Sequence, residues 1–169
     1  GSLSKVKSEH TGSPAGLLAT LATADAQYKL GKYDEAQKSY SDFVNAIQPP
    51  DALRSIAQLN LARIAENKKD LDGAKGAYEK LLAEAPHTFL KDEAAFGKAK
   101  VLLAQGKKQE AAEAFQAVKD GYADSPLVRD ATEQLTTLAT AGFVPAAVKA
   151  AQALQAVDAG TGAGAGAGK

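Results

Sequence analysis

Three copies of one short pattern recur along the chain at nearly fixed intervals. Each copy contains a turn, then an alanine and, four residues later, an aromatic residue, and the copies occupy residues 31–40, 69–78 and 106–115. The alanines, Ala36, Ala74 and Ala111, lie 38 and 37 residues apart. A period of this length is typical of stacked helical hairpins, because one hairpin cannot bury its own apolar face and must pack on its neighbours.

The apolar residues between these motifs fall at helical spacing, and proline-containing segments separate the hairpins. We therefore expect an all-α chain of three helical hairpins and a degenerate fourth, at about 15–48, 52–85, 89–123 and 127–158. Together they would form one repeat domain over residues 14–159. A loose leader is expected at 1–13 and a flexible Gly/Ala-rich tail at 160–169.

Each hairpin needs a turn between its two helices. Gly31 and Gly106 occupy this position in the first and third units, where glycine permits the left-handed backbone conformation that ends a helix. In the middle unit we expect Asn67 to take the role, because asparagine tolerates this conformation better than most residues.

Small residues indicate how closely the paired helices approach. Ala24, Ala62 and Ala99 lie on the first helices, twelve residues before the motif alanines on the second helices, so each pair can face across a hairpin. The aromatic residues follow the motif alanines by one helical turn. We expect these aromatic residues to fill the space where one hairpin meets the next: Tyr40, Tyr78 and Phe115.

This set of residues resembles the tetratricopeptide repeat family, whose hallmark is a small residue, a glycine turn, an alanine and then an aromatic residue. The resemblance covers about residues 15–126 and is clearest in Tyr33-Asp34-Glu35-Ala36 and in Asp72-Gly73-Ala74. It implies an α-solenoid with a right-handed superhelical stack, whose first helices line a concave groove for protein partners. The units here are longer than the family's usual period of about 34 residues.

A narrower resemblance concerns the long links between units. The segment Tyr122-Ala123-Asp124-Ser125-Pro126 is similar to links in the bacterial cell-envelope subgroup of these repeats. This similarity implies the soluble part of a bacterial envelope protein, either periplasmic or membrane-anchored and facing the periplasm. A chaperone-tail adaptor is disfavoured, because Leu21, Leu59 and Phe96 stand where such adaptors carry lysine and asparagine.

Charge and composition restrict the function further. Twenty acidic and twenty basic residues cancel, which leaves no long-range field to attract nucleic acid. The chain contains no cysteine, so disulfides and thiolate metal sites are excluded. No apolar run reaches the roughly 20 residues of a membrane helix. We interpret Gly1-Ser2 as a protease-site remnant, so membrane contact is expected only through an anchor lost upstream of it.

No catalytic, metal or cofactor site is expected. His10 and His87 lie 77 residues apart, and neither has a second ligand at metal-binding spacing. Acidic pairs such as Asp92-Glu93 fall at helix starts, where carboxylates favour the positive end of the helix dipole. We therefore predict a non-enzymatic protein without cofactors. The enzymatic alternative would depend on His87 and the Asp92-Glu93 pair.

The predicted binding surface is the concave face. Side chains one turn apart on the first helices would face this groove: Leu21, Asp25, Tyr28, Leu59, Arg63, Glu66, Phe96, Lys100 and Leu103. We expect Tyr28 and Phe96 to anchor an extended segment or helix of a protein partner. Arg63 and Lys100 would pair with its acidic groups. The alternative is that the three leucines and Phe96 belong simply to the hydrophobic core.

Self-assembly is the second functional hypothesis, beside the protein-interaction scaffold. The last expected helix carries few charges, and the segment that leads into it is apolar. If this surface packs on another copy of the chain to form a homo-oligomer, the contact residues are Phe143, Val144, Val148, Leu154 and Val157.

Overall fold

The computed structural model describes residues 13–46, 51–84 and 90–162, and the regular structure in these ranges is helical. Three hairpins pair α2 (Pro14–Lys29) with α3 (Tyr33–Val44), α4 (Asp51–Asn67) with α5 (Leu71–Glu84), and α6 (Lys91–Ala104) with α7 (Lys108–Gly121). The helices α8 (Leu127–Thr140) and α9 (Ala146–Gly162) follow. The predicted all-α class is confirmed.

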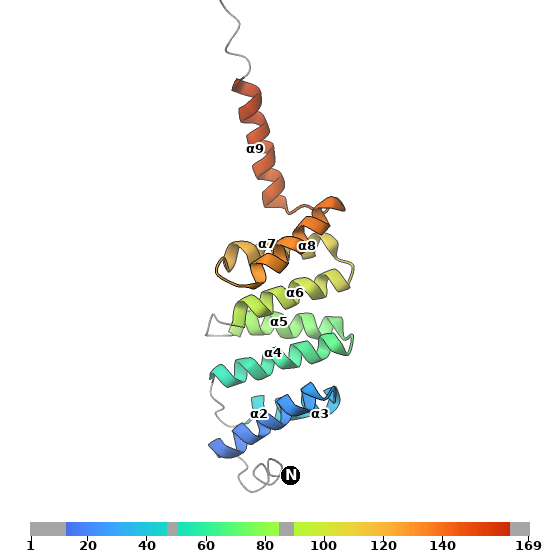
Figure 1. The fold of residues 1–169 in the computed structure, drawn as a ribbon, viewed down its shortest axis with the longest axis vertical. Coiled ribbons are helices and arrows are strands. Elements are labelled where there is room, and N and C mark those ends of the chain that lie inside the picture. Colours follow the sequence, from blue (N-terminus) through green and yellow to red (C-terminus); the bar gives the residue numbers. More distant parts are fainter. Residues whose placement is uncertain (1–12, 47–50, 85–89, 163–169) are drawn as a thin grey trace, which may run out of the picture.

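The hairpins stack one on the next along the long axis of the molecule (Figure 1). The closest packing joins the two helices of each hairpin, and the second helix of each hairpin also packs on the first helix of the next unit. Smaller contacts join α4 to α6 and α6 to α8 along the stack. This is the arrangement of a helical repeat solenoid, as the repeat pattern predicts.

The paired alanines lie at the centre of this packing. All six of them have an exposed fraction of 0%, and each pair belongs to one hydrophobic cluster: Ala24 with Ala36, Ala62 with Ala74, and Ala99 with Ala111. Their small side chains let the two backbones of each hairpin approach closely. A longer side chain at any of these positions would overpack the hairpin.

Two of the motif aromatics connect neighbouring hairpins. The Tyr40 hydroxyl donates to Asp25 Oδ1 in its own hairpin at 2.5 Å and accepts a hydrogen bond from Asn60 Nδ2 in the next hairpin at 3.0 Å. The Tyr78 ring instead lies against the backbone of Gly97 on α6. Tyr40 and Tyr78 therefore occupy the space between hairpins, where the sequence predicts them.

The hairpin turns each place one residue in the left-handed conformation. Gly31 (φ 72°) and Gly106 (φ 78°) adopt it as predicted, but in the middle unit the residue is Lys69 (φ 64°), so the prediction for Asn67 was wrong. The reason is hydrogen bonding. The backbone amides of Lys69 and Asp70 donate to carbonyls three and five residues earlier, which is the same pattern that ends α2 and α6.

The expected degenerate fourth hairpin is not closed. Helix α8 packs on α6 and α7, whereas α9 projects from the end of the stack and packs extensively on no described helix (Figure 1). The residue 37 positions after Ala99 is Thr136, which is exposed, and Ala151 stands where the motif requires an aromatic residue. Helices α8 and α9 therefore lack the surfaces that close the other hairpins.

The outer face of α8 is polar, as suits the end of a solenoid. Its exposed threonines each donate a hydrogen bond from the hydroxyl to a backbone carbonyl of the preceding turn: Thr132, Thr136, Thr137 and Thr140. This face needs no further helix to cover it.

Helix α7 nevertheless holds the base of α9. The Glu113 carboxylate accepts a hydrogen bond at 2.7 Å from the backbone amide of Ala146, the first residue of α9. Gln109 Nε2 donates to the carbonyl of Val144 at 3.0 Å. Because α9 has no acidic residue in its own first turn, Glu113 supplies the negative charge at the positive end of the helix dipole.

The ends of the chain are described only in part. Helix α9 runs to Gly162 and so enters the segment expected to form a flexible tail. At the other end Ser13 Oγ accepts a hydrogen bond from the amide of Gly16 at 3.2 Å and caps α2. The rest of the predicted leader and tail, 1–12 and 163–169, lies outside the described residues.

Candidate functional site

Two adjoining hollows, of about 210 and about 600 Å³, open between α4, α6 and α8. They share the lining residues Glu66, Phe96 and Lys100, and we name their combined surface the α4–α6–α8 hollow. The other lining residues are Arg63, Tyr78, Asp92, Glu93, Gly97, Leu103, Ala104, Pro126, Leu127, Asp130, Glu133 and Gln134.

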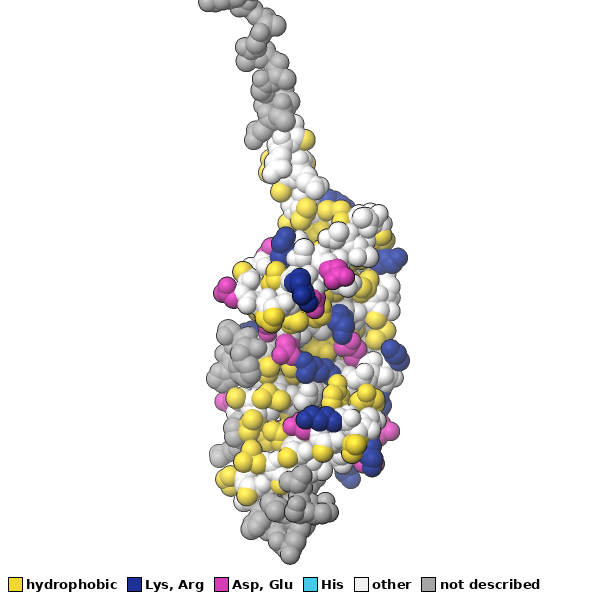
Figure 2. All heavy atoms as spheres, in the orientation of Figure 1, with side chains coloured by type: hydrophobic (Ala, Val, Ile, Leu, Met, Phe, Trp, Pro, Cys, Tyr) yellow, Lys and Arg dark blue, Asp and Glu magenta, His cyan; other side chains and the backbone are white. Residues whose placement is uncertain are grey.

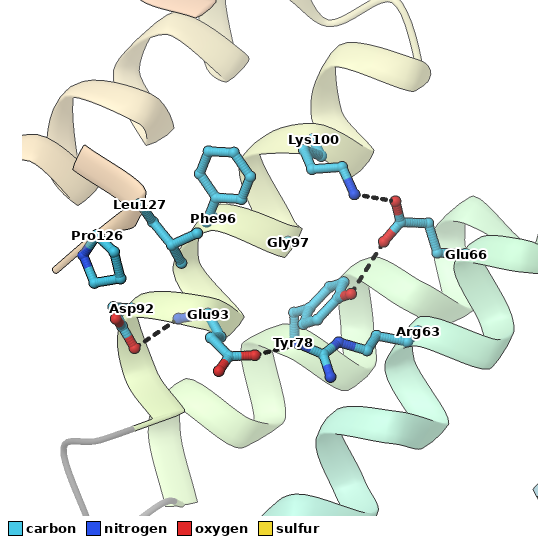
Figure 3. A pocket seen from close by; sticks show the side chains of 10 residues that line it. All are labelled: Arg63, Glu66, Tyr78, Asp92, Glu93, Phe96, Gly97, Lys100, Pro126 and Leu127. Atoms are coloured by element: carbon cyan, nitrogen blue, oxygen red, sulfur yellow. Dashed lines mark hydrogen bonds and ion pairs between the residues drawn. The ribbon is translucent and has the colours of Figure 1, made fainter. Parts of the chain in front are cut away.

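The apolar part of the hollow centres on α6. Phe96 is half-buried, and its ring meets that of Phe115 edge-on, with the ring centroids 5.5 Å apart. Leu103 and Leu127 are also half-buried, and Figure 3 shows Leu127 beside Phe96. These side chains contact the core on one side and leave apolar surface open on the other.

Both cations of the hollow are already paired within the chain. Arg63 on α4 forms an ion pair with Glu93 on α6, and Lys100 Nζ on α6 lies 2.7 Å from Glu66 Oε1 on α4 (Figure 3). The two pairs therefore tie α4 to α6. Because the four side chains remain 25–48% exposed, each pair adds only modestly to stability.

Tyr78 forms the wall of the hollow between α4 and α6. Its hydroxyl donates to Glu66 Oε2 at 3.0 Å, while the other oxygen of Glu66 binds Lys100, so Glu66 links three helices. Burial, together with the negative charge of Glu66, raises the pKa of Tyr78 well above its usual value. The phenol therefore stays protonated and serves as a fixed hydrogen-bond donor.

Three further carboxylates line the hollow. Asp92 Oδ2 accepts a hydrogen bond at 2.6 Å from the Ser125 hydroxyl, in the link before α8. Asp130 Oδ1 lies 3.2 Å from Nε of the exposed Arg129. Glu133 has no ion pair within the described ranges. Among the described residues, five carboxylates and two cations line the hollow.

The structure divides the nine predicted groove residues. The hollow brings five of them together: Arg63, Glu66, Phe96, Lys100 and Leu103. Leu21 and Leu59 are only 8% and 3% exposed, and their side chains lie in the hydrophobic core.

The two remaining members of the predicted set, Asp25 and Tyr28, lie on α2 and line neither hollow. Asp25 accepts the hydrogen bond from Tyr40, and burial together with this carboxylate raises the pKa of the Tyr40 phenol. The Tyr28 hydroxyl accepts a hydrogen bond from Asn67 Nδ2 at 3.3 Å. Both side chains therefore help to join the first hairpin or to link it to the second.

Sequence reasoning missed two residues of α6 that hold this helix against α5 and α4 at the hollow. Gly97 receives the ring of Tyr78, and Glu93 holds Arg63. The sequence does contain a signal for the contact between Tyr78 and Gly97. Aligning the repeats on their alanines places Asn60 and Gly97 at the same position, and Asn60 makes the corresponding contact with Tyr40.

The residues predicted for self-assembly differ in how far they are buried. Phe143 packs on the cluster around Phe115, with Lys108 Nζ 5.4 Å from its ring centroid. Val148 is half-buried near the base of α9, and Leu154 is 70% exposed on the projecting part. Val144 is half-buried in the link before α9. The side chain of Val157 lies outside the described residues.

The described ranges contain neither a metal-ligand cluster nor a membrane-spanning helix. No three His, Asp or Glu side chains there lie close enough together to hold a metal ion. No helix in that part of the chain is both long and apolar enough to cross a bilayer. His10 and His87 lie outside the described residues. Figure 2 shows positive and negative side chains interspersed over the visible face of the stack.

A comparison with protein-family profiles matches residues 2–138 to the tetratricopeptide repeat-like domain. The chain belongs to this family. The tetratricopeptide-like match ends within α8, so the projecting α9 lies beyond it. A search of curated proteins finds no significant match. Tetratricopeptide-like domains generally act as protein-interaction scaffolds and are typically non-enzymatic.

Proposed function

We propose that this chain is a scaffold whose α4–α6–α8 hollow binds a segment of a partner protein. The observation that carries the proposal is the exposed apolar surface of Phe96 and Leu103 within a hollow of about 600 Å³. Recognition sites commonly combine such apolar surface with a few fixed polar groups. Here Glu66 and Tyr78 are fixed by their mutual hydrogen bond.

Site-specific photo-crosslinking in a native extract tests this proposal. A photoreactive phenylalanine analogue replaces Gln134, which lines the hollow, or Ala117, which is exposed on α7 and lines neither hollow. We expect a defined protein adduct from position 134 alone. The further substitution Ala104→Trp, which fills the hollow from an exposed position, should abolish this adduct. Equal adducts from both positions, or an adduct that persists in the Ala104→Trp variant, would contradict binding in the hollow.

Self-assembly through α9 is a second proposed function, and the exposure of Leu154 favours it. Helix α9 projects from the stack with Leu154 70% exposed and with Lys149 as the only charged residue between Ala146 and Val157. An exposed helix with so few charges gains from packing its apolar side on another copy.

Analytical ultracentrifugation measures the oligomeric state and so tests this second function. Self-assembly predicts an oligomer that dissociates in the Leu154→Glu variant. The oligomer should persist in the Leu18→Glu variant, a matched change at a side chain that is 55% exposed at the other end of the stack. A wild-type protein that remains monomeric at high concentration would rule out assembly through α9.

We also propose that the chain is the soluble part of a bacterial envelope protein. Support comes from the similarity of the link at residues 122–126 to links of that subgroup. In this link the Ser125 hydroxyl donates to Asp92 on α6 and accepts a hydrogen bond from the amide of Leu127 at 3.2 Å. The link therefore joins the start of α8 to α6. Cell fractionation tests the proposal, and recovery of the native protein only with cytoplasmic markers would refute it.

A further inference from the structure

We infer that the segment bound in the α4–α6–α8 hollow carries lysine or arginine next to a large apolar side chain. This inference depends on the proposed binding function and specifies the chemistry of the partner. It reverses the expectation from the sequence that Arg63 and Lys100 would bind acidic groups.

The lining of the hollow is negatively charged. Five carboxylates and two cations give the hollow a formal charge of −3, whereas the whole chain carries equal numbers of acidic and basic residues. The hollow therefore differs from the rest of the protein in sign. A partner with positive charge complements it, and a negatively charged segment or a nucleic-acid backbone is repelled.

Both cations of the hollow already have carboxylate partners within the chain. Arg63 is paired with Glu93, and Lys100 with Glu66, whose second oxygen also accepts the Tyr78 hydrogen bond. An acidic partner would compete with Glu93 and Glu66 for these cations, and any gain from the new pair would be offset by the loss of the existing one. A basic partner leaves both pairs intact.

Two carboxylates of the hollow on α8 lie beside its apolar surface. Asp130 and Glu133 lie on α8 at the edge of the larger hollow, which also contains Phe96 and Leu103. Arg129, which pairs with Asp130, is 89% exposed, so this contact is weak and easily exchanged. An apolar side chain over Phe96 and Leu103 would therefore bring an adjacent lysine or arginine toward the two carboxylates.

Selection from a random peptide library displayed on phage tests the inference, because it does not require the natural partner to be identified first. We expect the enriched peptides to place lysine or arginine beside leucine, isoleucine or phenylalanine. Their affinity should fall at least about tenfold in the Asp130→Lys/Glu133→Lys variant and should weaken as salt is added. The Glu110→Lys/Asp120→Lys variant, with the same change of charge on α7, should bind them as the wild type does.

Enriched peptides that are acidic, and that Ala104→Trp excludes, would overturn the inferred chemistry and leave binding in the hollow standing. Peptides that bind the Ala104→Trp variant normally would contradict the hollow itself. Basic peptides weakened equally by both charge reversals would show only non-specific attraction and would overturn the inference. A library without any binder would count against both proposals.

Discussion

The ring of Tyr78 on α5 lies directly against the backbone of Gly97 on α6. A Cβ atom added to Gly97 would stand 2.8 Å from the Tyr78 hydroxyl oxygen and closer still to the ring carbons. Tyr78 is 2% exposed and has little room to withdraw. This contact sets the distance between the second and third hairpins at the α4–α6–α8 hollow.

The substitution Gly97→Ala should therefore destabilise the protein, by about 1–3 kcal/mol, because it overpacks a full interface. In most helix interiors the same change stabilises, by about 0.5–1 kcal/mol. Gly76→Ala on α5 is the matched control, since a Cβ there meets nothing within 4 Å. Urea unfolding of both variants measures the difference. Equal stabilisation by both would mean that Tyr78 does not pack on Gly97.

The repeat predicts much of this fold because its period places residues of one kind in one environment. The pairs such as Ala62 with Ala74 are buried as expected, and Tyr40 bridges two hairpins. The period does not show which side chain meets a given surface. Alignment of Gly97 with Asn60 marks the position, but it does not show that the Tyr78 ring packs on the glycine backbone there.

The charges of the candidate site were harder to predict. A helical pattern indicates the face on which Arg63 and Lys100 lie, but not that Glu93 and Glu66 on neighbouring helices have already bound them. The open fourth unit has a similar cause. The fourth unit keeps a glycine turn at Gly142 and an alanine at Ala147, near the spacing of the other units. That α9 does not pack at Thr136 is seen only from the exposure of this residue in the structure.

The turn at Lys69 should be improved by glycine. A lysine in the left-handed conformation is strained by roughly 1–2 kcal/mol, and glycine removes this strain at an entropic cost of about 0.5–1 kcal/mol. We expect Lys69→Gly to raise the free energy of unfolding by up to about 1 kcal/mol. Lys80→Gly, on the exposed side of α5, should instead lower it by about 1 kcal/mol. A loss of stability in Lys69→Gly would contradict the φ of 64° at this residue.

Alkaline pH should destabilise the protein through Tyr78. Its pKa is raised in the folded state by burial and by the charge of Glu66, whereas the unfolded chain loses the phenolic proton near about pH 10. The stabilising effect is therefore complete below that pH. Above it the unfolded state binds fewer protons than the folded state, so stability falls as pH rises.

The variant Tyr78→Phe isolates this effect, because it differs from the wild type only in lacking the phenolic hydroxyl. Between pH 9 and 11, the wild type should lose more stability than Tyr78→Phe, with a difference approaching about 1.4 kcal/mol per pH unit above pH 10. Denaturant unfolding at a series of pH values measures it. Parallel pH profiles for the two proteins would show that the phenol is not held protonated by its surroundings.

The base of α9 should depend on Glu113. Replacement by alanine removes the acceptor for the amide of Ala146 and the negative charge at the start of the helix, at a local cost of about 1 kcal/mol. Hydrogen exchange should then become faster in the first turn of α9 and remain unchanged in α4. Glu110→Ala, at an exposed position of the same helix α7, is the control. Unchanged exchange in Glu113→Ala would mean that α9 is not capped from α7.

Binding in the α4–α6–α8 hollow is tested most directly by NMR, with isotope-labelled protein titrated with the most enriched library peptide. We predict amide shift changes that concentrate around Phe96, Leu103, Asp130 and Glu133 and disappear in the Ala104→Trp variant. Shift changes confined to α9, or spread over α3, α5 and α7, would contradict the proposal that this hollow is the binding site.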